Sequence, residues 1–308
     1  MQKLNIIIIG GAGFIGRTLS IILLEAGQKI TVLSRTAVPS SFLHNGINVL
    51  QADVSQPGSW QENIADFEVV INLSGSSIFR RWTIRGKQEI LDARILTVRN
   101  IVEAIRKPMG NVRQFFSVSG VGYYGFRGEE VLDENNPAGS DYIAQVAAQW
   151  EDVTQPVKEL GVRLMICRLG HVLGMHGGAL PKLATLARLH LGSYWGNGKQ
   201  WISWVHEEDL ARAVLFLLDT HTISGPVNIT SPNPIRNREM MQVLTKILSE
   251  RVVIPHIPKF ALQVMLGQFS SVFVNGQKVM PAILQQRGFL FKFPILSEAL
   301  NDLLKPYH

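Results

Sequence analysis

Short apolar runs alternate with longer amphipathic segments through the first half of the chain. The apolar runs predict strands near residues 5–9, 29–33, 47–50, 68–73, 113–119 and 162–168. The amphipathic segments predict helices near residues 14–26, 56–64, 85–106, 140–160 and 208–219. Strands and helices that alternate in this way are typical of an α/β fold, in which helices cover both faces of a doubly wound parallel sheet.

The pattern changes after about residue 170. Glycines make residues 170–178 loop-like, and further glycines lie among the aromatic residues of 191–204. Beyond them we expect a strand at 226–230, a helix at 236–248, a strand at 252–254, and helices near 259–268 and 278–287. We therefore predict a first, Rossmann-type domain over 1–170, to which 200–230 returns. A smaller C-terminal α+β substrate lobe spans 171–308, and its helical domain starts at about 236.

Composition and charge exclude several classes of protein. The 308 residues are 46% hydrophobic and 18% charged, and the net charge of +6 is scattered without a basic block, which argues against a nucleic-acid partner. The single cysteine, Cys167, excludes an intrachain disulfide and is expected to be buried. No run reaches the roughly 18 apolar residues that span a bilayer, so we expect no membrane partner and a cytoplasmic location.

The segment from residue 4 to residue 16, LNIIIIGGAGFIG, is the most informative of the chain. An apolar run ends in Gly10, Gly13 and Gly16, and a helical pattern begins at Phe14 and Ile15. In a Rossmann-type unit, such glycines form the tight turn, admit a pyrophosphate and let helix and strand pack closely. The amide groups at the helix start then bind the phosphates.

The end of the second predicted strand distinguishes between the two nicotinamide dinucleotides. NAD-binding units usually place an acidic residue about 20 residues beyond the glycines, to bind the ribose 2′-OH. Ser34 and Arg35 stand there instead, and both can bind a 2′-phosphate. We therefore predict NADP(H) as the cofactor, although Arg35 can also be a solvated surface charge.

The carboxyl ends of the predicted strands carry residues that are expected to point into one crevice. Those assigned to the cofactor are Gly10, Gly13, Phe14, Ile15, Gly16, Ser34, Arg35, Asp53, Val54, Leu73, Ser74 and Gly75. The strand that ends at Ser119 contributes to the same crevice.

Several motifs resemble those of the extended short-chain dehydrogenase/reductases, the nucleotide-sugar epimerase superfamily. They are GGAGFIG at 10–16, NLSG at 72–75, SVSGVGYYG at 117–125 and WVHEEDL at 204–210. Other segments resemble an atypical branch, the epimerase family proteins with a C-terminal domain of unknown function; they are Arg81-Trp82, Trp150-Glu151, 177–180, 200–204 and 225–228. The resemblance implies a Rossmann fold, a small-molecule substrate and a homodimer.

The resemblance also implies catalytic residues, and the chain departs from the pattern at one of them. Ordinary members carry Tyr-x-x-x-Lys on a helix, where the lysine lowers the pKa of the tyrosine, together with a serine from the preceding strand. Ser119 and Tyr142 match the serine and the tyrosine, but Val146 stands in place of the lysine. Tyr123 is a second candidate proton donor, although paired aromatic residues beside a glycine are more often packing residues.

The substrate candidates lie beyond the fourth predicted strand and in the aromatic loop. Arg80, Arg81, Lys87 and Arg94 can clamp an anionic group or form the solvated face of a helix. Trp82 and Trp201 can stack on a substrate, and they can equally be packing anchors, as can Trp204. His206 precedes three acidic residues at a helix start and has a structural role, and no metal site is predicted.

Two functions fit these features. The first is an NADP(H)-dependent oxidoreductase or epimerase-like enzyme, acting by hydride transfer on a small anionic carbonyl or sugar-nucleotide substrate. The second, motivated by Val146, is a catalytically silent NADP(H)-binding sensor or regulatory protein.

Overall fold

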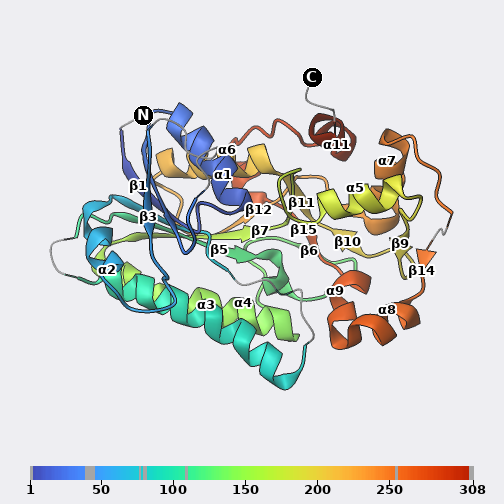
Figure 1. The fold of residues 1–308 in the computed structure, drawn as a ribbon, viewed down its shortest axis with the longest axis horizontal. Coiled ribbons are helices and arrows are strands. Elements are labelled where there is room, and N and C mark those ends of the chain that lie inside the picture. Colours follow the sequence, from blue (N-terminus) through green and yellow to red (C-terminus); the bar gives the residue numbers. More distant parts are fainter. Residues whose placement is uncertain are drawn as a thin grey trace.

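A seven-stranded parallel sheet forms the centre of the computed structural model, which describes residues 3–38, 46–75, 78, 82–107, 110–253 and 256–304 (Figure 1). Its strand order is β12 (Gly225–Ile229), β7 (Arg163–Leu169), β5 (Gln114–Gly120), β4 (Val69–Asn72), β1 (Asn5–Ile9), β2 (Lys29–Ser34) and β3 (Ile47–Gln51). All neighbouring strands are parallel. The predicted doubly wound sheet is thereby confirmed, and the order reverses between β1 and β4, where ligands bind in such sheets.

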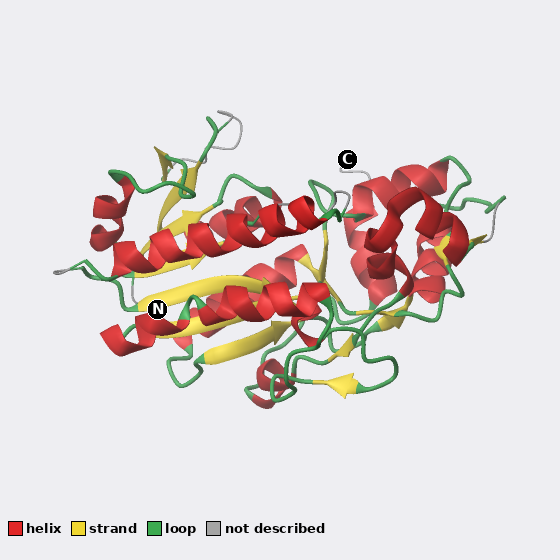
Figure 2. Cartoon of the chain, turned by 90° about the horizontal axis from the view of Figure 1, so that it is seen from below, coloured by secondary structure: helices red, strands yellow, loops and turns green. Residues whose placement is uncertain are grey.

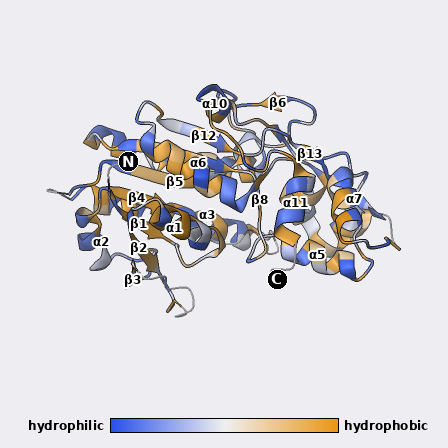
Figure 3. Cartoon of the chain, turned by 90° about the horizontal axis from the view of Figure 1, so that it is seen from above, coloured by the Kyte–Doolittle hydropathy of each residue, from blue (hydrophilic) through white to orange (hydrophobic). Residues whose placement is uncertain are grey.

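Helices cover both faces of this sheet (Figure 2). On one face, α1 (Phe14–Glu25) packs against α6 (Glu207–Asp219). On the other face lie α3 (Ile84–Ile105), α4 (Tyr142–Asp152) and the short α2 (Trp60–Asn63). Because both faces are covered, the central strands are apolar throughout, as the orange colour of β1, β4 and β5 in Figure 3 shows.

A second group of helices lies beyond the carboxyl end of the sheet. α5 (Leu180–Arg188), α7 (Asn237–Ile247) and α11 (Leu296–Leu304) enclose a separate core around Trp204, which is fully buried. The described residues also form four two-stranded ribbons, of which the last named pairs a segment after β5 with the C-terminal part of the chain. They are β8–β11 (His171–Leu173, Trp204–His206), β10–β13 (Trp201–Ile202, Ile235–Arg236), β9–β14 (Tyr194–Trp195, His256–Ile257) and β6–β15 (Val131–Leu132, Lys278–Val279).

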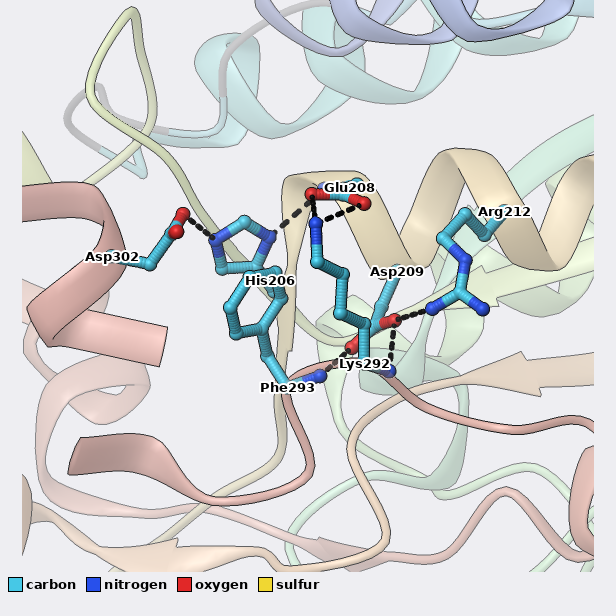
Figure 4. A network of polar contacts seen from close by, with 7 residues as sticks. All are labelled: His206, Glu208, Asp209, Arg212, Lys292, Phe293 and Asp302. Carbon is cyan, nitrogen blue, oxygen red and sulfur yellow. Dashed lines mark hydrogen bonds and ion pairs between the residues drawn. The ribbon is translucent and has the colours of Figure 1, made fainter. Parts of the chain in front are cut away.

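The first turn of α6 attaches the C-terminal segment to the sheet domain (Figure 4). The buried carboxylate of Asp209 accepts hydrogen bonds from the backbone N–H groups of Lys292 and Phe293, at 2.7 and 2.8 Å. The ring of His206 stacks on Phe293 at 4.0 Å, and its Nε2 lies 3.3 Å from a carboxylate oxygen of Asp302 on α11. His206 also caps α6, because its Nδ1 accepts from the N–H of Glu208.

Some predicted elements differ from those in the structure. The helix expected over 140–160 ends at Asp152, because Pro156 lacks the N–H that would continue it, and a 3-10 helix covers Gln155–Leu160. The segment 278–287 begins with strand β15 before α10 (Ala282–Gln286). Residues 252 and 253 lie outside the strands, and the strand of this region is β14. The strand β8 lies within the predicted loop 170–178. The helix predicted near 259–268 is present as α8 (Lys259–Leu266), and the short α9 (Ser271–Val274), which was not predicted, follows it before β15.

No helix in the described part of the chain combines the length and the apolarity needed to cross a bilayer.

Candidate functional site

The turn between β1 and α1 requires glycine at two positions. Gly10 adopts a φ of +78°, and a Cβ at Gly16 would lie 2.4 Å from the backbone of Gly11. Gly13, the N-cap of α1, has no side chain to accept from the first-turn amides, and that turn holds no acidic residue. The amide groups at this end of α1 can therefore receive an anion, which is the chemistry that a diphosphate requires.

Phe14 and Ile15 contribute packing as well as their backbone. A Cβ on Gly174 or Gly177 would lie within 2.6 Å of Phe14 side-chain atoms, so the loop after β8 rests on this ring. Ile15 packs against the core cluster shared by α1 and α6. The hydroxyl of Thr18 donates to a carboxylate oxygen of Glu207 at 2.7 Å. The turn between β1 and α1 is thus held by the loop after β8 and by the first residue of α6.

The residues predicted to recognise the adenosine end lie at the ends of β2 and β3. Ser34 Oγ donates to the carbonyl of Thr36 at 2.9 Å, and Arg35 is exposed. Hydrogen bonds from Ser55 lower the pKa of Asp53, and the positive charge of Arg35 lowers it further. Val54 accepts a hydrogen bond from the Asn100 side chain at its carbonyl oxygen. A cationic and a hydroxyl group therefore lie next to each other at the end of β2, and both are groups that can bind a phosphate.

The loop after β4 lies directly against the glycine turn. A Cβ at Gly10 would lie 3.2 Å from the backbone nitrogen of Ser74, and Leu73 donates its N–H to Ile9 at 2.9 Å. The fully buried Asn72 shapes this loop, because its Oδ1 accepts from both the N–H and the hydroxyl of Ser74. Asn72 is thus a positioning residue of the crevice. The sequence feature that could have identified Asn72 is a polar residue at the end of an apolar strand.

A cavity of about 420 Å³ lies between the end of β5 and the C-terminal lobe. Ser119, at the end of β5, lines it and is 5% exposed. Its hydroxyl has no hydrogen-bond partner among the residues that the structure describes. Val146 and Trp150 of α4 line the same cavity. The Trp150 ring lies near the loop after β4, because a Cβ at Gly75 would be 3.8 Å from it.

Tyr142 lies in an adjoining cavity of about 560 Å³ rather than on the wall of the first. Its hydroxyl donates to the carbonyl oxygen of Lys87 at 2.7 Å, and the Lys87 ammonium lies 4.8 Å from the centre of its ring. Trp82 meets the same ring edge-on at 5.0 Å. Burial raises the pKa of Tyr142, and the charge of Arg94 opposes this. The structure thus brings together Trp82, Lys87 and Tyr142, whereas Arg80 and Arg81 lie outside the described residues.

The Tyr123–Tyr124 pair packs around a buried ion pair. The Arg168 guanidinium lies 3.4 Å from the centre of the Tyr123 ring and pairs with Glu151 at 2.7 Å. Tyr124 is fully buried, its hydroxyl donates to Asn228, and burial raises its pKa to about 12. These contacts give Tyr123 a packing environment beside the cavity.

Trp201 lines the 420 Å³ cavity and is held from outside by charged residues. Its Nε1 donates to Glu129 at 3.1 Å, and the guanidinium of Arg236 lies 3.8 Å from the ring centre. Arg236 also pairs with Glu129 at 2.6 Å, so these residues connect the β5–β6 region to the C-terminal lobe. The third tryptophan, Trp204, belongs to the core of that lobe.

Three polar groups of this site escaped the sequence prediction. Arg17 donates from Nε to the carbonyl of Ala12 and so braces the glycine turn from within α1. The indole N–H of Trp150 and the side-chain oxygen of Gln200 line the cavity and have no hydrogen-bond partner within the described ranges. An arginine directly after the last glycine is a usable sequence signal, but the other two are visible only in three dimensions.

The residues that the structure describes contain no group of three or more His, Cys, Asp or Glu side chains able to hold a metal ion. Cys167 is fully buried, as expected, and burial raises the pKa of its thiol to about 12.

Comparisons with known proteins identify the class. Residues 6–230 match the model of the NAD dependent epimerase/dehydratase family, and residues 257–303 match a domain of unknown function, DUF1731. The chain therefore belongs to the NAD-dependent epimerase/dehydratase family. The resemblance inferred from the motifs is confirmed, including the C-terminal domain.

Individual relatives extend the match over the whole chain. The epimerase family protein SSP1921 of Staphylococcus saprophyticus is 36% identical over 301 residues, which cover 97% of this chain and 98% of that protein. The crystal structure of human epimerase family protein SDR39U1 with NADPH has a TM-score of 0.82 and 27% identity, and covers 97% of this chain and 98% of that one. The Thermus thermophilus UDP-glucose 4-epimerase complex with NAD shares the fold, at a TM-score of 0.78 and 19% identity, over 97% of each chain.

Proposed function

We propose that this protein binds NADP(H) and acts by hydride transfer on a small anionic carbonyl or sugar-nucleotide substrate. The amides at the start of α1, behind Gly10 and Gly16, would hold the diphosphate, and Ser34 and Arg35 would hold the 2′-phosphate. The NADPH complex of the human relative supports this cofactor. Bound there, the nicotinamide would supply the hydride, and the protein would position the substrate.

The observation that carries the proposal is the Ser119 hydroxyl. A buried hydroxyl without a partner in the described structure costs stability, and Ser119, unlike the equally unpartnered Ser20, lines a cavity in which a ligand can satisfy it. In the cavity, Ser119 would donate to the oxygen of the substrate carbon that receives or loses the hydride. Arg94 also lines this cavity, and no acidic side chain is among its described lining residues, which favours an anionic substrate.

Calorimetric titration with NADPH and NADH tests the cofactor assignment. Wild-type protein is expected to bind NADPH more tightly, and Arg35→Ala is expected to weaken NADPH binding about tenfold while leaving NADH binding unchanged. Arg85→Ala is the matched control, because Arg85 is an exposed arginine of α3 that pairs with Glu89 within its own helix. Equal affinities for the two cofactors in the wild-type protein would show the assignment to be wrong.

A catalytically silent sensor is the second candidate, and two observations favour it. Val146 lines the cavity where relatives of the wider superfamily carry a lysine, and the Tyr142 hydroxyl is bonded to Lys87. Turnover of NADPH across a panel of carbonyl compounds and sugar nucleotides separates the two functions. Tight NADPH binding without any turnover would favour the sensor, and turnover that is lost in Ser119→Ala would favour the enzyme.

A further inference from the structure

Two buried polar atoms of opposite character line the 420 Å³ cavity, and neither was assigned a role above. Gln200 Oε1 is a hydrogen-bond acceptor and Trp150 Nε1–H is a donor. Each is shielded from solvent and has no hydrogen-bond partner among the described residues. Such groups destabilise the folded protein unless a ligand satisfies them.

The orientation of the Gln200 amide is determined by its neighbours. Its Nε2 donates to the carbonyl oxygens of Trp195 and Phe273, at 3.1 and 2.6 Å. Only the NH₂ group can donate to both carbonyls, so Oε1 is the group left without a partner on a side chain that lines the cavity. The amide is therefore fixed by two elements of the C-terminal lobe, β9 and α9.

Trp150 approaches the cavity from the sheet domain. It lies on α4, four residues after Val146, so the two side chains share one face of the helix, and both line the cavity. An indole N–H donates but cannot accept, so it selects an acceptor atom. Its ring lies on the side of Gly75, near the loop after β4, whereas Gln200 belongs to the other lobe. The two groups thus face the cavity from different lobes.

We propose that Trp150 and Gln200 are specificity-determining residues of this cavity, which selects substrates carrying both an acceptor oxygen and a hydroxyl or N–H donor. Trp150 binds the acceptor, and Gln200 binds the donor. The proposal rests on the proposed function, because it names the substrate class of the same site. The cavity thereby discriminates against compounds that offer an acceptor alone, because the buried Gln200 oxygen would stay unsatisfied in their complexes.

A matched pair of aromatic ketones tests this selection. 2-Hydroxyacetophenone offers an acceptor and a donor, whereas 2-methoxyacetophenone keeps the acceptors and loses the donor. Their dissociation constants are measured by ligand-observed NMR on the full chain saturated with NADP⁺, so that no turnover occurs. Wild-type protein is expected to bind the hydroxy compound about tenfold more tightly. Equal affinities, or no binding of either ketone up to its solubility limit, would overturn the proposal.

Variants test the roles of Gln200 and Trp150 separately. Gln200→Lys keeps donors for the two carbonyls and removes the acceptor, so the preference for the hydroxy compound is expected to disappear. Gln200→Met removes both functions and serves as the second variant, with thermal unfolding measured for each. Trp150→Phe breaks no hydrogen bond within the described protein and is expected to weaken both ketones by a similar factor. A preference that survives in both Gln200 variants would contradict the assignment.

The outcome separates this inference from the proposed function. NADPH binding is measured on the same samples by calorimetry. If the protein does not bind NADPH and the unliganded chain distinguishes the two ketones, the roles proposed for Trp150 and Gln200 stand and the cofactor proposal fails. If the protein binds NADPH and does not distinguish the ketones, the cofactor proposal stands and the roles proposed for Trp150 and Gln200 fail.

Discussion

We expect the Ser119 hydroxyl to reduce the free energy of unfolding and to be required for NADPH-dependent turnover. It is buried and has no partner in the described structure, so Ser119→Ala should leave the free energy of unfolding unchanged or raise it by up to about 1 kcal/mol. NADPH-dependent turnover should fall about a hundredfold or more, because a donor to the reacting oxygen is lost. Thermal unfolding and steady-state kinetics on the same preparation provide both measurements.

Ser20 provides a matched control for Ser119. It is also fully buried with a hydroxyl lacking a partner in the described ranges, but it lies on α1, in the sheet domain, away from the cavity wall. Ser20→Ala should therefore change stability in the same direction and leave turnover intact. Equal losses of turnover in the two variants would contradict a specific role for Ser119.

The motif assigns Tyr142 a role in proton transfer, but the surroundings of its hydroxyl in the structure do not favour that role. Its hydroxyl donates to the Lys87 carbonyl, and burial raises its pKa, so it is a poor proton donor or base near neutral pH. Tyr142→Phe is expected to cost about 1 kcal/mol of stability and to change turnover less than threefold. A loss of two orders of magnitude in kcat would instead restore Tyr142 as the proton donor.

At the scale of the element, the first turn of α6 determines how the C-terminal segment is attached. Asp209→Ala would leave the N–H groups of Lys292 and Phe293 without their carboxylate, so we expect a loss of about 2–4 kcal/mol in the free energy of unfolding. Glu208→Ala is the control from the same turn. It removes a solvent-accessible pair with the Lys292 side chain and should cost less than about 1 kcal/mol. Denaturant unfolding followed by circular dichroism measures both values.

The elements themselves were predictable from the sequence to unequal degrees. The central strands and α1 were predicted because apolar runs between glycines and amphipathic helices are local signals. Helices α5 and α11 were missed; each has only nine residues, and their apolar faces pack in the second core with α7 and Trp204. Glycine spacing alone located the tight turn between β1 and α1. The orientations of Gln200 and Trp150, and the bond from Tyr142 to Lys87, depend on segments far apart in the chain, which no local pattern encodes.

At the scale of the whole molecule, we expect His206 to make the free energy of unfolding depend on pH, because it lies where the C-terminal segment packs on α6. Burial lowers its pKa, and the carboxylates of Asp302, Asp209, Glu207 and Glu208 oppose that shift. The unfolded chain then binds more protons than the folded one as pH falls below about 6.5, so stability is greatest above that pH and is lost below it.

Unfolding free energies measured between about pH 7.5 and 5.5 test this dependence, and they should fall by at most about 1.4 kcal/mol per pH unit for this one histidine. His206→Asn keeps an N-cap acceptor for α6 and does not titrate, so its curve should be flatter than that of the wild-type protein. Parallel curves for the two proteins would show that His206 does not couple stability to pH.

A crystal structure of the full chain grown with NADPH tests the central claim most directly. The account predicts the diphosphate at the amides that begin α1, the 2′-phosphate beside Ser34 and Arg35, and the nicotinamide at the mouth of the cavity lined by Ser119. A dinucleotide bound away from the Gly10–Gly16 turn, or a turn that stays empty in crystals saturated with NADPH, would contradict it.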